Sequence, residues 1–124
     1  MYIQTNTNPL NNDTGDCVIR AISLAIDKSW DEVYTALSVY GYDMKDWGNS
    51  NAVWNRYLLE NGFKRDFIPS TCPYCYTVSD FCNDHPIGNY LLASGQHLVC
   101  VKNSNYMDSW NSGGMIPIYY YWKD

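Results

Sequence analysis

The chain has 124 residues, which is enough for a single domain over residues 1–124 with one hydrophobic core. Hydrophobic residues make up 46% of it and charged residues 17%, so we expect a globular protein rather than a disordered one. The net charge is −5, and the eight lysines and arginines form no basic stripe, which argues against nucleic acid as a partner.

The sequence also bears on location. It contains no apolar run of roughly 18 residues, so we expect no membrane-spanning helix and no membrane partner. Residues 1–12 are polar and lack the basic and apolar regions of a secretory signal. We therefore expect a cytoplasmic protein, whose five cysteines are thiols or ligands rather than a disulfide framework.

The first predicted element is a helix over residues 17–26, which follows an irregular arm and a turn-forming run at residues 11–15. Asp16 is a favourable N-cap residue for it. The helix is apolar nearly all round rather than along one stripe, which is typical of a buried central helix.

Three further helices are predicted. Ser29 and Glu32 have the spacing of a capping box, and Gly41 is expected to end the helix that this box begins. A third helix is predicted over residues 50–61 and a short fourth one over residues 78–83, before a proline.

The last third of the chain has the period of strands. Strands are predicted at residues 90–93, 97–101, 106–110 and 116–122, with turn-forming residues between them. Helices followed by a strand meander indicate an α+β domain, with N-terminal helices packed on a C-terminal antiparallel sheet.

Cys17 is the strongest candidate nucleophile. It lies in the first turn of the predicted central helix, where free N–H groups and the helix dipole favour a thiolate. A thiolate nucleophile needs a base, and the chain has two histidines. His97 begins a predicted core strand, whereas His85 lies between an aspartate and a proline at a helix end and is the weaker candidate.

Asp108 follows His97 by eleven residues, across a turn between two predicted strands. A two-residue turn at residues 102–103 would put Asp108 directly opposite His97, and a four-residue turn would make the two diagonal neighbours. In either register the carboxylate can fix the imidazole tautomer and stabilise the imidazolium. Cys17, His97 and Asp108 are therefore the predicted catalytic residues.

Three motifs carry a resemblance: residues 15–17 (Gly-Asp-Cys), residues 95–99 (Gly-Gln-His-Leu-Val) and residues 106–110 (Tyr-Met-Asp-Ser-Trp). Together they resemble the papain-like cysteine peptidase superfamily, and more narrowly small uncharacterised papain-like proteins of phages and bacteria. The resemblance implies the papain-like fold, a thiolate–imidazolium pair and attack on an amide or related acyl bond. The resemblance does not imply a particular substrate. We expect no cofactor, a protein or peptide substrate, and action in the cytoplasm, inside the host cell if the protein is phage-encoded.

Two departures from that family concern the substrate site. Papain-like enzymes commonly place a glutamine six residues before the nucleophile, where its amide completes the oxyanion hole. Asn11 stands there in this sequence, and Asn12 is equally close, so both are candidates. The chain is also about half as long as a full papain-type enzyme, so either its cleft is shallow or a partner protein completes it.

A competing cluster has metal-ligand spacing. Cys72 and Cys75, followed by Cys82 and His85, could supply four ligands to zinc, although we favour a plain structural role for them and no bound metal. Cys100 alternates away from His97 and is expected to be inert core. Three functions thus remain open: an active cysteine hydrolase, a catalytically idle papain-like fold that acts as a binding module, and a small zinc-stabilised interaction protein.

Overall fold

The computed structural model of the protein describes residues 1–12, 14–69 and 74–123 and has α+β architecture. Within these residues lie four helices and six strands. In chain order they are β1 (Tyr2–Gln4), α1 (Cys17–Ile26), α2 (Trp30–Met44), α3 (Asn51–Glu60), β2 (Lys64–Phe67), α4 (Val78–Asp84), β3 (Asn89–Ala93), β4 (Leu98–Lys102), β5 (Asn105–Asp108) and β6 (Tyr119–Trp122). The four helices and the four C-terminal strands agree with the predicted positions to within a few residues.

The strands form one mixed sheet in the order β1-β5-β4-β3-β6-β2. The C-terminal strands pair antiparallel, as predicted. The prediction of a purely antiparallel sheet is wrong at one edge, because β1 pairs parallel with β5, in a segment expected to be an irregular arm. The prediction also missed β2, which forms the other edge against β6. All four β2 side chains are exposed, so this strand carries no hydrophobic alternation.

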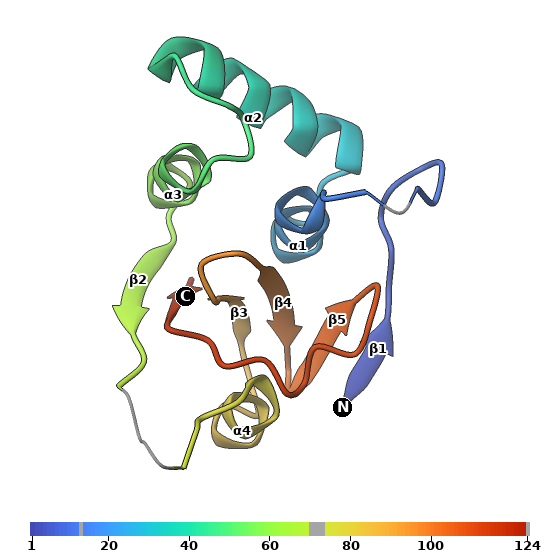
Figure 1. Ribbon diagram of the computed structural model, residues 1–124, viewed down its shortest axis with the longest axis vertical. Helices are drawn as coiled ribbons and strands as arrows, with labels where there is room; N and C mark the ends of the chain where they lie inside the picture. Colours follow the sequence, from blue (N-terminus) through green and yellow to red (C-terminus); the bar gives the residue numbers. More distant parts are fainter. Residues whose placement is uncertain (13, 70–73, 124) are drawn as a thin grey trace.

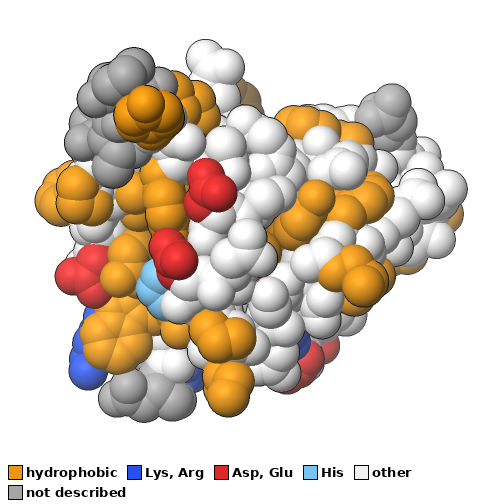
Figure 2. Space-filling model, turned by 90° about the horizontal axis from the view of Figure 1, so that it is seen from below, with side chains coloured by type: hydrophobic (Ala, Val, Ile, Leu, Met, Phe, Trp, Pro, Cys, Tyr) orange, Lys and Arg blue, Asp and Glu red, His pale blue; other side chains and the backbone are white. Residues whose placement is uncertain are grey.

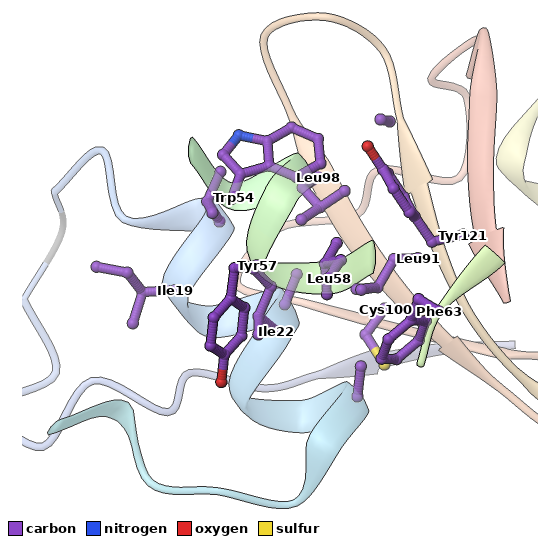
Figure 3. Packing of buried hydrophobic residues seen from close by; sticks show 14 of the residues in the cluster. Ile19, Ile22, Trp54, Tyr57, Leu58, Phe63, Leu91, Leu98, Cys100 and Tyr121 are labelled. Atoms are coloured by element: carbon purple, nitrogen blue, oxygen red, sulfur yellow. The ribbon is translucent and has the colours of Figure 1, made fainter. Parts of the chain in front are cut away.

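Helices cover both faces of this sheet, with α1, α2 and α3 on one side and α4 on the other (Figure 1). Strand β4 contributes side chains to the hydrophobic cores on both faces of the sheet. Leu98 and Cys100 pack with α1 and α3, whereas Val99 and Val101 pack with α4. Figure 3 shows the first core, where side chains of α1 and α3 converge on those of the sheet. Because β4 is buried on both faces, the segment that follows His97 is firmly fixed.

Helix α2 does not stop at Gly41, contrary to prediction, but continues to Met44 and ends at Lys45 in a left-handed conformation. A glycine is needed at position 41 because the backbone of the following loop lies close to it. A Cβ at this position would lie 2.7 Å from the Asp46 carbonyl oxygen and 2.9 Å from the Gly48 nitrogen. The missing side chain therefore lets the loop after α2 fold back tightly against the helix.

The outer face on the α4 side carries hydrophobic side chains at its surface (Figure 2). Phe67 on β2 and Ile87 after α4 are 77% and 80% exposed. A hollow nearby is lined by Phe67, Ile68, Pro69, Tyr76, Phe81, His85 and Tyr120.

No helix in the described part of the chain combines the length and apolar character that crossing a membrane requires.

The close approach at Gly41 yields a stability prediction. We expect Gly41→Ala to lower the free energy of unfolding by about 1–3 kcal/mol, because the added methyl group overlaps backbone atoms that cannot move independently. Urea denaturation measures the change. Gly114→Ala is the matched control, since a Cβ there meets no atom within 4 Å. Equal stability of the two variants would contradict this account of Gly41.

Candidate active site

Cys17 is the first residue of α1, as predicted, and its side chain is half-buried. The preceding residue, Asp16, is the N-cap, but its carboxylate makes no capping hydrogen bond to the helix backbone. The first N–H groups of a helix have no intrahelical acceptor and present the positive end of the helix dipole. The Cys17 sulfur thus lies where a negative charge is favoured.

His97 lies in the tight turn between β3 and β4, directly before β4 begins. The turn is closed by a hydrogen bond from the Ser94 N–H to the His97 carbonyl oxygen, 3.0 Å long. Gly95 has a φ of +97°, which suits glycine, and its carbonyl accepts a 3.2 Å hydrogen bond from the Asn51 side chain on α3. Helix α3 therefore holds the turn that carries the histidine.

Asp108 is the last residue of β5, next to the imidazole. Strands β4 and β5 are joined by a two-residue turn, Asn103-Ser104, in which both residues have positive φ as a type I′ turn requires. Continuing this register places Asp108 opposite Val99, so Asp108 and His97 are diagonal neighbours. The predicted diagonal register is found and the directly opposed one is wrong. The diagonal register comes from a two-residue turn at residues 103–104 rather than from the expected four-residue turn. The His97 Nε2 and the Asp108 Oδ2 lie 2.5 Å apart.

The Cys17 thiol and the His97 imidazole line the same small pocket and interact electrostatically, so the structure brings the three predicted residues together. Because Nε2 faces Asp108, Nδ1 is the ring nitrogen left for the sulfur. Burial opposes ionisation of the thiol, but hydrogen bonds from His97 and the Leu98 N–H, with the positive charges of His97 and Arg20, lower the pKa of Cys17 overall.

The pKa of His97 moves the other way. Burial disfavours the imidazolium, yet the hydrogen bonds to Asp108 and Cys17 outweigh it and raise the pKa of His97 to about 9. The lowered thiol pKa and the raised imidazole pKa both favour transfer of the proton from the Cys17 sulfur to His97.

The Asp108 carboxylate is buried and held on every side. Its Oδ2 accepts a 2.8 Å hydrogen bond from the Ser112 hydroxyl, and its Oδ1 accepts one of 2.8 Å from the Ser109 N–H. These bonds fix the plane of the carboxylate. The indole of Trp110 lies against the His97 ring, with 4.9 Å between ring centroids. The imidazole is thereby positioned by both its acceptor and its neighbouring ring.

A buried ionic network connects this carboxylate to the start of α1. Arg20 forms an ion pair with Asp16, four residues earlier, and its NH2 lies 3.9 Å from Asp108 Oδ1. Asp16 also accepts hydrogen bonds from Trp30 Nε1 at 2.9 Å and from Asn8 Nδ2 at 3.1 Å.

The sequence interpretation missed this network. The signal was present, because Arg20 is the one charged residue of an otherwise apolar helix, and a buried guanidinium requires carboxylates nearby.

The Cys17 sulfur faces a small pocket of about 110 Å³, lined by Gly15, Cys17, Val18, Asn49, Asn51, Trp54, Gly95, Gln96 and His97. Asn11 and Asn12, the predicted oxyanion-hole residues, are exposed and do not line it. The carboxamides that do are Asn49, Asn51 and Gln96. That of Asn51 is engaged on both sides, by Gly95 and by the Trp54 indole, so Asn49 and Gln96 are the candidate donors.

The predicted zinc ligands are not assembled in the described part of the chain. Cys72 lies outside the described residues. Cys75 is exposed, Cys82 is on the buried face of α4, and His85 stacks on Phe81. Among the described residues, no three histidine, cysteine, aspartate or glutamate side chains are grouped closely enough to hold a metal ion.

Cys100 is fully buried, as the expectation of a core thiol requires, and burial raises its pKa to about 12. Burial likewise raises the pKa of Cys82. Neither thiol has the ionising environment of Cys17.

Comparisons of the chain with family models, with curated proteins and with solved structures gave no match.

The ionic network predicts a large effect of Arg20 on stability. We expect Arg20→Met to lower the free energy of unfolding by about 3–5 kcal/mol, because it leaves the buried Asp16 carboxylate without its cation. Denaturant titration gives the value. Arg56→Met is the matched control: it removes an exposed ion pair with Glu60, and we expect little change. If both variants unfold alike, the network does not stabilise the fold.

Proposed function

We propose that the protein is a papain-like cysteine hydrolase that cleaves an amide bond in a protein or peptide. The observation that carries the proposal is the convergence of Cys17, His97 and Asp108, with the thiol at a helix start beside the imidazole and a carboxylate hydrogen-bonded to the imidazole. This is the arrangement that a thiolate nucleophile, its acid-base partner and an orienting group require.

The first half of the reaction forms an acyl-enzyme. The Cys17 thiolate attacks the carbonyl carbon of the scissile amide, and a C–S bond forms while the carbonyl π electrons move to oxygen. The tetrahedral intermediate collapses as the C–N bond breaks, and the His97 imidazolium gives its proton to the departing nitrogen. The products of this step are an amine and a thioester on Cys17.

The second half regenerates the enzyme. Neutral His97 now takes a proton from water, whose oxygen attacks the thioester carbon. The C–S bond then breaks, which releases a carboxylic acid and restores the thiolate–imidazolium pair. Asp108 remains ionised throughout and stabilises the imidazolium in each half.

Two parts of the chain can stabilise the oxyanion. The N–H groups at the start of α1 have no intrahelical acceptor and lie beside Cys17, and Asn49 and Gln96 line the same pocket. At about 110 Å³ this pocket accommodates the reacting groups and little more. The rest of a substrate must lie over neighbouring surface, or against a partner protein that completes the cleft.

The ion pair can be tested without a substrate. Ultraviolet thiolate absorbance, with the Cys17→Ala spectrum subtracted, should give a Cys17 pKa below the ordinary value of about 8.5. In His97→Ala the pKa should rise above that value, because burial then dominates. Cys100→Ser is the control and should leave the titration in place. If the Cys17 pKa is the same in the parent protein and in His97→Ala, the result would indicate an idle fold used as a binding module.

Catalytic activity should depend on the protonation states of Cys17 and His97. With a mixed fluorogenic peptide pool, activity should rise as Cys17 ionises, below the usual thiol range, and fall as His97 loses its proton near pH 9. Cys17→Ala should abolish cleavage. Asp108→Asn should keep part of it, since a carboxamide oxygen can still accept from Nε2–H, whereas Asp108→Ala should lose more. Full activity of Cys17→Ala would overturn the proposal.

The oxyanion assignment has its own comparison. Removing both Asn49 and Gln96 side chains by alanine substitution should lower kcat by about 10²-fold, the usual effect of losing an oxyanion donor. Asn11→Ala with Asn12→Ala is the matched pair of carboxamide deletions outside the pocket, and it should leave kcat near the parent value. The reverse result would return the role to Asn11 or Asn12.

A further inference from the structure

A second and larger hollow adjoins the Cys17 pocket. It encloses about 560 Å³ between the start of α1, helix α2 and the loop after α2. The two hollows share Gly15 and Asn49 in their linings, so they lie next to each other beside the start of α1. A substrate whose scissile bond lies at Cys17 can therefore place a neighbouring side chain in the larger hollow.

Four aromatic residues are among those that line it. Trp30 and Tyr34 stack on α2 with ring centroids 5.1 Å apart and an interplanar angle of 15°. Trp30 is held by its indole hydrogen bond to Asp16. Tyr42, farther along α2, and Trp47 in the loop after it also line the hollow and are 74% and 81% exposed. Rings exposed to this degree at a concave site offer their faces to a ligand.

The charge of the hollow is negative. Asp16 and Asp46 line it, and no lysine or arginine is among its lining residues. The Asp16 charge is matched by Arg20. The Asp46 carboxylate instead accepts hydrogen bonds from the Trp47 N–H at 2.7 Å and the Ser50 hydroxyl at 2.8 Å. Within the described residues it pairs with no cation, so its charge is available to a ligand.

Aromatic faces beside a carboxylate attract cations. The chain itself provides an example, because the Lys45 ammonium lies 4.2 Å from the Tyr42 ring centroid, outside this hollow. Arginine matches such a site best: its aliphatic stem covers apolar ring surface, its planar guanidinium stacks on rings, and it can bind a carboxylate through two donors.

We propose that the hollow lined by Trp30, Tyr34, Tyr42, Trp47 and Asp46 binds an arginine side chain next to the scissile bond of the substrate. The assignment rests on the proposed function, because it treats the neighbouring Cys17 as the residue that attacks that bond. It defines the substrate class as a peptide or protein segment with a basic residue close to the cleavage point.

The test uses peptidyl chloromethyl ketones, in which the Cys17 sulfur displaces chloride and forms a C–S bond. Reagents with arginine, leucine or glutamate at the first or second residue from the warhead are compared by mass spectrometry of Cys17 labelling. Each rate is divided by the iodoacetamide rate of the same variant. We expect the best arginine reagent to exceed its leucine counterpart by about tenfold, and the glutamate reagent to be slowest.

Variants locate the preference. Asp46→Asn and Trp47→Ala should each bring the arginine-to-leucine ratio close to one. Asp43→Asn is the matched charge control, because Asp43 lies on α2 but lines a different hollow, and it should keep the parent ratio. A leucine reagent as fast as arginine in the parent protein, or a preference that survives both variants, would overturn the arginine assignment.

Failure of the two proposals can be told apart. If iodoacetamide does not favour Cys17, the proposed function fails at the nucleophile. The hollow is then judged by titrating Cys17→Ala with an acetylated arginine amide and following tryptophan fluorescence. Saturable binding that Trp47→Ala and Asp46→Asn weaken would still support an arginine site, and no binding would reject it. The matching leucine amide should bind more weakly.

Discussion

The charge of the buried Asp108 carboxylate is the constraint on which the site depends. A carboxylate this deep needs cations around it, and it has one from each of two elements: Arg20 on α1 and His97 before β4. Arg20 is also paired with Asp16, so one guanidinium faces two carboxylates. A protonated His97 supplies the second positive charge. The elevated pKa of His97 follows from that need, and a protonated His97 in turn favours the thiolate of Cys17. The stability of the fold and the ionisation of Cys17 therefore depend on the same set of charges.

How far the sequence predicted the fold depended on whether an element carries a hydrophobic pattern. Helix α1 and the central strands do, and their positions were predicted closely. Strand β2 has four exposed side chains, and the three-residue β1 acquires its structure from the pairing with β5, so neither could be read from local period. Gly41 shows the limit of local rules: it resembles a helix stop, yet the loop that packs on it decides its role.

Within the site, residues defined by chemistry and spacing were predictable, whereas those defined by tertiary packing were not. Cys17 at a helix start and Asp108 across a hairpin from His97 follow from position along the chain. The Ser112 hydroxyl reaches Asp108 from a loop whose path no local pattern gives. The lining of the Cys17 pocket by Asn49 similarly depends on the fold of the loop after α2.

The hairpin between β4 and β5 makes the chemistry sensitive to chain length. It turns in two residues, Asn103 and Ser104, and strand side chains alternate between two differently built layers. One added or lost residue in this hairpin would move Asp108 to the other face of the sheet and put a neighbour in its place, Met107 after an insertion or Ser109 after a deletion. Related chains should consequently tolerate many substitutions between His97 and Asp108 but no insertion or deletion. The number of residues between the two should be conserved, whereas their identities need not be.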